Sequence, residues 1–265
     1  MRVKLMGILN VSPDSFYDGG KYVKPKNAVD RAWEIFEEGG DILDIGGESS
    51  RPGSEPVSVK EELRRVMPVL RALSHDFPLP ISIDTYKPEV AERAIELGVS
   101  IINDIYGMRN QRMREIAANY GVEVIVMHMK GEPKTMQKNP IYENVVNEIN
   151  QFFQERIKEL REAGVKKHKI ILDPGIGFGK KLEHNLQIIA NLKKFRIHGC
   201  RLMLGPSRKS FVGSILNKQN PEDRLYGTLG SVAVAVEEGV DILRVHDIRE
   251  TKEMIEVMEA IRNER

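Results

Sequence analysis

Polar and charged residues recur at the ends of short apolar runs along this chain. Eight runs rich in isoleucine, valine and leucine each finish in an amide, carboxylate, hydroxyl, imidazole or cation. A single aspartate in such a place is most simply a helix cap, but eight polar ends that meet at one edge predict a binding or catalytic site. These end residues are Asn10, Asp44, Asp84, Asn103, Asp104, His128, Asp173, Ser207, Lys209, Arg244 and His246.

Two glycine-rich loops follow the second and sixth runs. The loop Gly46–Gly53 contains Arg51, whose planar guanidinium matches phosphate oxygens. The loop Asp173–Lys180 is not the dinucleotide-binding fingerprint, because its third glycine comes one residue early. It is not a phosphate-binding P-loop either, because no serine or threonine follows Lys180.

Two further segments near the C-terminus predict an anion site. Ser207–Ser210 places hydroxyl and cationic groups where a helix is expected to begin after the seventh run. Arg244 and His246 are two residues apart, so both side chains point to the same face of a strand. Together these segments predict a clamp for a negatively charged group.

The elements that must position these residues are short strands alternating with helices. Strand-like runs lie at Val3–Asn10, Asp41–Gly46, Pro80–Asp84, Ser100–Asp104, Val122–His128, Lys169–Asp173, Cys200–Gly205 and Asp241–His246. Helical periodicity is clear at Asn27–Glu38, Ser58–Ser74, Glu143–Ala163, Leu182–Lys194 and Ile248–Arg262. Eight strands alternating with eight helical segments predict an α/β fold, a (β/α)8 TIM barrel forming a single domain over residues 1–265. A doubly wound open sheet is the alternative.

Composition excludes several classes of function. The 40 basic and 39 acidic residues leave a net charge of +1, so no electrostatic footprint for nucleic acid is present. The longest apolar run, Val232–Val236, is too short to span a bilayer. Cys200 is the single cysteine, which excludes an intrachain disulfide and any multi-cysteine metal site. We expect a cytoplasmic enzyme with no nucleic-acid or membrane partner.

The motifs, taken in order, resemble those of dihydropteroate synthases. The similar segments are Met6–Phe16 with Asp18–Gly20, Asp44–Gly53, Ile83–Thr85, Ile102–Asp104, Asp173–Lys180, Ser207–Phe211 and Arg244–Asp247. The resemblance covers nearly the whole chain. It implies a TIM barrel enzyme of folate biosynthesis, with small-molecule substrates and a homodimeric assembly. The implied reaction joins 6-hydroxymethyl-7,8-dihydropterin diphosphate to 4-aminobenzoate and yields 7,8-dihydropteroate and pyrophosphate.

The resemblance also implies roles for individual residues. The pterin edge would be held by Asp84, Asn103, Asp173 and Lys209, with Arg244 against the ring and Met127 and Phe178 in contact with the ligands. The diphosphate would be bound by Ser50, Arg51, Arg244 and His246, with Ser210 in the same substrate-binding set and Asn10 as a ligand of Mg²⁺. Asp18, Arg51 and Lys209 would be catalytic, and Phe16 would contact the incoming arylamine.

Two other functions share parts of this pattern. A methyltetrahydrofolate-using methyltransferase domain would keep the aspartate and asparagine contacts but has no need of a diphosphate clamp made by Arg51, Ser207–Lys209 and His246. A non-catalytic pterin-binding protein would not need Asn10, Arg51 and Lys209. The intact clamp favours the synthase.

Overall fold

The computed structural model describes residues 3–11, 25–49, 53–74 and 76–264. Its strands are β1 (Lys4–Asn10), β2 (Ile42–Gly46), β3 (Ile81–Asp84), β4 (Ile101–Asp104), β5 (Glu123–Met127), β6 (Ile170–Asp173), β7 (Arg201–Leu204) and β8 (Ile242–Val245). Its α-helices are α1 (Pro25–Glu37), α2 (Val59–Leu73), α3 (Pro88–Ile95), α4 (Gln111–Tyr120), α5 (Val145–Glu162), α6 (Leu182–Ile189), α7 (Ser210–Leu216), α8 (Leu225–Glu237) and α9 (Ile248–Asn263). Short 3₁₀ helices are η1 (Lys167–Lys169), η2 (Leu192–His198) and η3 (Pro221–Arg224).

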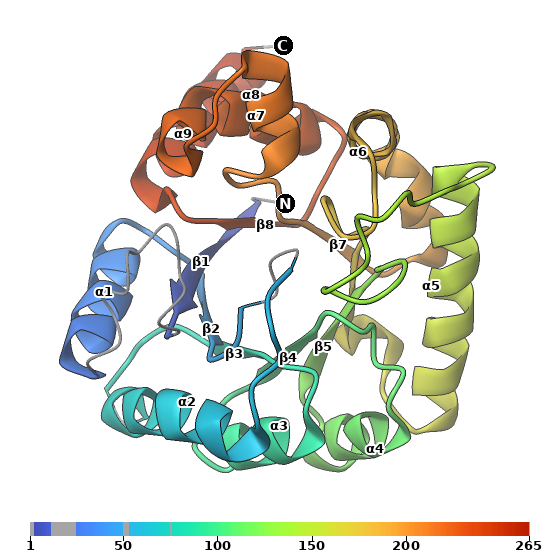
Figure 1. Cartoon of the computed structure of the whole chain (residues 1–265). Helices are drawn as coiled ribbons and strands as arrows, with labels where there is room; N and C mark the ends of the chain where they lie inside the picture. Colours follow the sequence, from blue (N-terminus) through green and yellow to red (C-terminus); the bar gives the residue numbers. More distant parts are fainter. Residues whose placement is uncertain (1–2, 12–24, 50–52, 75, 265) are drawn as a thin grey trace.

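The strands form a closed parallel barrel in the order β1 to β8, and β8 pairs with β1. Helices form an outer ring around the strands (Figure 1). The predicted (β/α)8 TIM barrel is therefore confirmed, and the open-sheet alternative is wrong. All eight strands lie within the runs predicted from sequence, because β-type apolar runs buried on both faces are a strong signal.

The barrel interior is filled by one ring of apolar side chains, which we call the lower ring. Its members are Met6, Ile42, Ile101, Ile125, Ile171, Met203 and Ile242, all at most 2% exposed. Residues two positions further along a strand point the same way. On β2, β4, β5, β6 and β8 these residues are Asp44, Asn103, Met127, Asp173 and Arg244. Together with Asp84 at the end of β3, they form an upper ring at the carboxyl ends of the strands, and this ring is mostly polar.

One predicted helix is divided in the structure. The periodicity predicted a helix over Leu182–Lys194, but α6 ends at Ile189 and η2 begins at Leu192. Asn191 lies between them with φ −132° and ψ 25°, outside the helical region. Its Nδ2 donates to the carbonyl oxygen of Gln187 at 2.8 Å. A side-chain amide that bonds to the helix backbone favours a helix end, so the helix ends one turn early.

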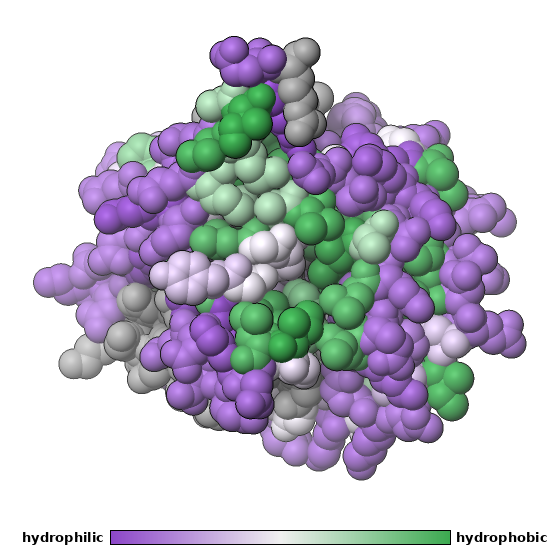
Figure 2. Space-filling model, turned by 90° about the horizontal axis from the view of Figure 1, so that it is seen from above, coloured by the Kyte–Doolittle hydropathy of each residue, from purple (hydrophilic) through white to green (hydrophobic). Residues whose placement is uncertain are grey.

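A groove of about 230 Å³ lies among α6, α7 and α8. Exposed apolar side chains line it, among them Leu186, Ile215, Leu216 and Val234, and the aromatic Tyr226 on α8 is 78% exposed. Figure 2 shows apolar side chains gathered on the face seen from above in Figure 1, where α7 and α8 lie.

None of the helices in the described part of the chain combines the length and the apolar character that a membrane-spanning helix requires.

Candidate functional site

Arg244 organises the floor of the mouth of the barrel. From β8 its Nε donates to Asp44 Oδ2 at 2.6 Å, and its second terminal nitrogen donates to Asp84 Oδ2 at 2.8 Å. Burial alone lowers the pKa of Arg244, but the charges of Asp44 and Asp84 outweigh it and raise that pKa. One cation therefore joins carboxylates from β2 and β3.

Asp44 is a site residue that the sequence analysis placed at a strand end but gave no role. It is fully buried, and its Oδ2 also accepts a hydrogen bond from Asn103 Nδ2 at 3.1 Å. Its second oxygen, Oδ1, is buried without a hydrogen-bond partner among the described residues. The signal for Asp44 in the sequence was its two-residue spacing from Ile42, which predicts an inward direction.

Asp173 and Lys209 form the opposite side of the floor. Asp173 Oδ1 accepts from the backbone nitrogen of Gly175 at 2.8 Å. Lys209 Nζ donates to the carbonyl oxygen of Ile176 at 2.6 Å and lies 4.8 Å from the ring centroid of Phe178. Burial raises the pKa of Asp173 and lowers that of Lys209 to about 8, and the attraction between the two charges opposes both shifts.

Two other carboxyl groups titrate near neutral pH. Burial raises the pKa of Asp84 to about 7, with Arg244 opposing the shift and the negative charge of Asp44 reinforcing it. Burial also raises the pKa of Asp104 to about 6, although the backbone nitrogens of Tyr106 and Met108 donate to its carboxylate at 2.8 Å each. Asp104 is thus held by the loop after β4, whereas Asp84 lies at the mouth, where a strongly shifted carboxyl is typical of a functional site.

An apolar wall stands beside the polar floor. Met127 and Phe178 pack in one buried cluster with Ile105, Met129 and Met136. Tyr86 and Tyr106 lie against this cluster, with ring centroids 4.8 Å apart. A flat heterocycle would find donors and acceptors along its edge and apolar contacts on its face, which is the usual composition of a small-molecule site.

The loops after β7 and β8 bring a second polar group to the mouth. Ser207 Oγ lies 2.9 Å from His246 Nδ1, and the backbone nitrogen of His246 donates to the same hydroxyl at 3.2 Å. Lys209 immediately precedes α7, and Ser210 is its exposed first residue. Arg208 forms an ion pair with Asp247. Of the predicted anion clamp, the structure joins Ser207 to His246, while Lys209 Nζ reaches the loop after β6 instead.

Asn10 lies at the end of β1 beside the same mouth. A Cβ atom added to Gly46 would lie 3.6 Å from Asn10 Oδ1 and 3.7 Å from Asp84 Oδ2, so the two side chains flank this glycine. Among the described residues, no group of three or more His, Cys, Asp or Glu side chains is arranged to hold a metal ion. A single amide oxygen still suits Mg²⁺, which keeps most of its waters and binds substrate phosphates.

Four of the predicted site residues, Phe16, Asp18, Ser50 and Arg51, lie outside the described residues. The other ten lie at the carboxyl ends of the strands, in the loops that follow them or, for Ser210, at the start of α7. These ten are Asn10, Asp84, Asn103, Met127, Asp173, Phe178, Lys209, Ser210, Arg244 and His246.

Comparison with known proteins identifies the family. The model of the pterin binding enzyme family matches residues 6–246. The dihydropteroate synthase of Escherichia coli strain K12 is 46% identical over 256 residues, which covers 97% of this chain and 90% of that protein.

Two solved structures extend this likeness to the fold. A Yersinia pestis dihydropteroate synthase in a sulfonamide drug complex superposes with a TM-score of 0.95 at 43% identity, covering 100% of this chain and 95% of the other. A Xanthomonas albilineans dihydropteroate synthase with 4-aminobenzoic acid gives a TM-score of 0.92 at 40% identity, covering 98% and 93%. With the barrel, the polar mouth and these matches in agreement, the chain belongs to the dihydropteroate synthase family.

Proposed function

We propose that this chain condenses 6-hydroxymethyl-7,8-dihydropterin diphosphate with 4-aminobenzoate, as a transferase of folate biosynthesis. The observation that carries the proposal is the upper ring, where Asp84, Asn103 and Asp173 converge beside Arg244 and Lys209. We further propose that residues 1–265 form one pterin-binding domain, since the strands of the barrel extend from Lys4 to Val245.

The upper ring matches the edge of a pterin. The 2-amino group and the ring N–H groups are donors, and the carboxylates of Asp84 and Asp173 accept such bonds. The amide of Asn103 both donates and accepts, and Lys209 supplies a cation for the ring's acceptor atoms. Each buried donor left without a partner costs about 1–3 kcal/mol. The upper ring of the protein would therefore discriminate strongly against other heterocycles.

The leaving diphosphate needs positive charge where its oxygen departs. Arg244 and His246 approach the mouth from β8 and the loop that follows it, and we propose that Arg51 and Ser50 add to this clamp. When bound, Mg²⁺ held by Asn10 and the diphosphate oxygens would neutralise charge on the leaving group. Fixed cations that stabilise the departing oxygen lower the barrier to breaking the C–O bond.

The nucleophile requires little activation. An aniline nitrogen is unprotonated near neutral pH, so it can attack the exocyclic methylene without a strong general base. The positive charge that develops on the methylene spreads into the pterin, and we propose that Asp18 stabilises it while Phe16 contacts the arylamine. Exclusion of water from this centre would prevent hydrolysis of the activated pterin.

One assay separates this function from its alternatives. The chain should release pyrophosphate only when the pterin diphosphate, 4-aminobenzoate and Mg²⁺ are all present. A methyltransferase would instead consume methyltetrahydrofolate without pyrophosphate release, and a binding protein would bind the pterin without turnover. Pyrophosphate release that does not require an arylamine would contradict the proposed transfer.

We propose that the metal acts on the leaving group and has no structural role. Chelation should then abolish turnover while the melting temperature of the free protein changes by less than about 1 °C, because one amide ligand contributes little to folding. Differential scanning calorimetry with and without chelator provides the measurement. A large fall in melting temperature would indicate a structural metal.

A homodimer is our proposal for the assembly, and the apolar groove of α6–α8 supports it as the interface. Surfaces of this kind mark association sites on proteins. Val234→Asp, on α8, should convert a dimer into a monomer in sedimentation velocity experiments. The matched control is Ile141→Asp, which changes a residue that is 65% exposed and outside the groove. Equal sedimentation of all three proteins would contradict this interface.

A cytoplasmic location, which we also propose, is compatible with the free, buried Cys200.

A further inference from the structure

We propose that Lys180 is a positioning residue for the pterin site, acting together with His128. Lys180 ties the loop of residues 174–179 to the end of β5 and thereby fixes Asp173 and Phe178 in place. The inference rests on the proposed function, because its readout is the binding of the pterin substrate. Neither residue was given a role by the sequence analysis beyond the polar end at His128.

The ammonium group of Lys180 is fully engaged inside the protein. The residue is 3% exposed. Its Nζ lies 3.0 Å from His128 Nδ1, 3.2 Å from the carbonyl oxygen of His128 and 3.0 Å from that of Phe178. Burial lowers the pKa of Lys180 well below its usual range, and the charge of Asp173 opposes that shift. The amino nitrogen has room for three hydrogen bonds, and these three contacts use all of them. Lys180 therefore has no donor left for a ligand and acts through the groups that it holds.

The loop that Lys180 holds lies directly against the chain after β5. A Cβ atom at Gly175 would lie 2.0 Å from the carbonyl oxygen of His128, and one at Gly179 would lie 2.1 Å from that of Lys130. Both glycines also have positive φ, 69° and 63°, a conformation that other residues rarely adopt. The backbone approach is thus as close as glycine allows at two points, and Lys180 bonds across the same contact.

The held loop carries much of the pterin floor and wall. Asp173 precedes it and accepts from its Gly175 nitrogen at 2.8 Å. The carbonyl oxygen of Ile176 accepts from Lys209 Nζ, and Phe178 packs in the apolar wall. A displacement of the loop would move all three at once. The residues proposed to contact the arylamine and the diphosphate belong to β1, β2 and β8 or follow these strands in the chain. A displacement of this loop would affect them less.

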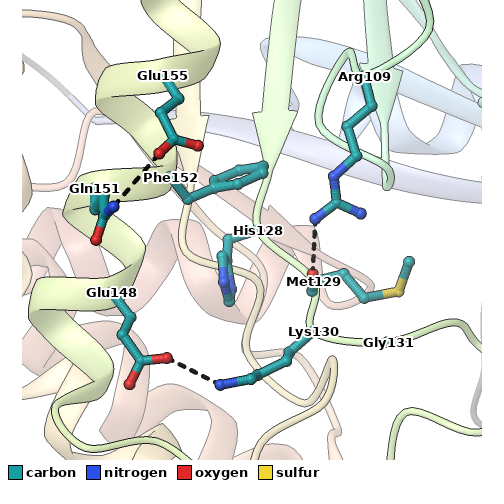
Figure 3. Close-up of a pocket in the computed structure, with 9 residues that line it drawn as sticks. All are labelled: Arg109, His128, Met129, Lys130, Gly131, Glu148, Gln151, Phe152 and Glu155. Carbon is teal, nitrogen blue, oxygen red and sulfur yellow. Dashed lines mark hydrogen bonds and ion pairs between the residues drawn. The ribbon is translucent and has the colours of Figure 1, made fainter.

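His128 is held as a neutral imidazole. Burial lowers its pKa well below the usual range, and the charge of Lys180 lowers it further. Its Nδ1 lies 3.0 Å from Lys180 Nζ. The imidazole packs edge-on against Phe152, with centroids 5.0 Å apart, and near Tyr142 at 6.2 Å. Its outer side faces a hollow of about 330 Å³ beside α5 (Figure 3). The ring therefore gives Lys180 a fixed partner.

The test is steady-state kinetics of Lys180→Met, which keeps a similar stem and removes all three donors. We expect the KM for the pterin diphosphate to rise at least about tenfold, the loss of roughly one charged hydrogen bond. The KM for 4-aminobenzoate should change less than about twofold. Lys181→Met is the matched control, because it removes the exposed neighbouring lysine and should leave both constants unchanged.

A general loss of stability must be distinguished from a positioning role. Phe195→Leu weakens the outer core between α5 and η2, where Phe195 is 1% exposed and packs against Phe153. We would assay Phe195→Leu at a temperature at which its free energy of unfolding equals that of Lys180→Met. Under these conditions Phe195→Leu should show no selective rise in the KM for the pterin diphosphate. His128→Leu removes only one of the three acceptors and should give a smaller rise, about threefold, which decides the question should Lys180→Met fail to fold.

Two results would overturn the proposal. One is an unchanged pterin KM in folded Lys180→Met or, failing that, in folded His128→Leu. The other is an equal rise in both KM values, as for a variant that is only less stable. Failure of the proposed function would look different, since the unmodified chain would then release no pyrophosphate. Calorimetric titration of the pterin diphosphate into each variant measures the same loss without turnover.

Discussion

The lower and upper rings of the barrel share the same strands and the same inward direction, yet they have opposite properties. Ile42, Ile101, Ile171 and Ile242 of the lower ring are at most 2% exposed and pack as one apolar cluster. Two residues further along those strands, the upper ring presents Asp44, Asn103, Asp173 and Arg244. A single pleat repeat thus separates the residues that close the barrel from those proposed to bind the pterin.

The difference shows where the barrel interior carries buried charge. The seven apolar side chains of the lower ring stabilise the barrel through burial and dispersion. The upper ring instead holds several carboxyls around one guanidinium, leaves Asp44 Oδ1 without a partner among the described residues, and raises the pKa of Asp84 to about 7. Such a ring stabilises the fold poorly alone and gains partners when a donor-rich ligand binds.

The largest expected effect comes from the lower ring. Ile125→Ala removes a fully buried side chain from its centre and should reduce the free energy of unfolding by about 2–5 kcal/mol. Urea denaturation measures the loss. The kcat/KM per folded molecule should stay within about threefold, because Ile125 belongs to the apolar cluster and is not itself a proposed substrate contact. A large fall in kcat/KM with little loss of stability would remove the distinction between the rings.

The next effect comes from the upper ring and has the opposite character. Asp173→Ala removes an acceptor proposed for the pterin edge and should weaken binding of the pterin diphosphate at least about tenfold. Isothermal titration calorimetry measures the affinity, and a melting curve checks that the variant is folded. Unchanged affinity in the folded variant would exclude Asp173 from the pterin site.

The smallest effect concerns stability and depends on pH. Because the pKa of Asp84 is raised to about 7 in the folded chain from an ordinary value of 3.8, its ionisation opposes folding. This destabilisation appears as pH rises through the interval between the two values and is complete above about 7. Asp84→Asn should therefore raise the melting temperature at pH 8 by about 2 °C or more, and by less at pH 5.

A lower melting temperature for Asp84→Asn would contradict this expectation, and it would have a definite physical cause. The ion pair of Asp84 with Arg244, 2.8 Å long, favours the ionised carboxylate. A lower melting temperature for Asp84→Asn at pH 8 would show that this pair outweighs the penalty of burial. Weaker pterin binding by the same variant is expected in either case.

The fold followed from the sequence because apolar runs with polar ends are a local signal. The strands were predicted to within about two residues, whereas the helix that begins at Leu182 was predicted too long. The side-chain amide of Asn191 donates to the carbonyl oxygen of Gln187 and favours a helix end, although the apolar periodicity continues. The roles of individual residues came from the resemblance to a family, and the two-residue period explains why those residues converge.

Contacts between distant segments could not be predicted in this way. Asp44 was visible as a strand end, but its bond to Arg244 joins residues 200 positions apart. The contact of Lys180 with His128 depends on two loops that pack together at Gly175 and Gly179. No periodic pattern in the sequence predicts such packing. Local patterns thus predict which residues face inward, and the closed barrel decides which of them touch.

A crystal structure of this chain with the pterin diphosphate would show whether the upper ring binds the pterin. We expect the amino group and ring N–H groups of the pterin to lie within about 3.2 Å of the carboxylates of Asp84 and Asp173 and the amide of Asn103. This placement also puts the ring face against Met127 and Phe178. A pterin bound away from the upper ring, for example in the hollow beside α5 (Figure 3), would contradict it.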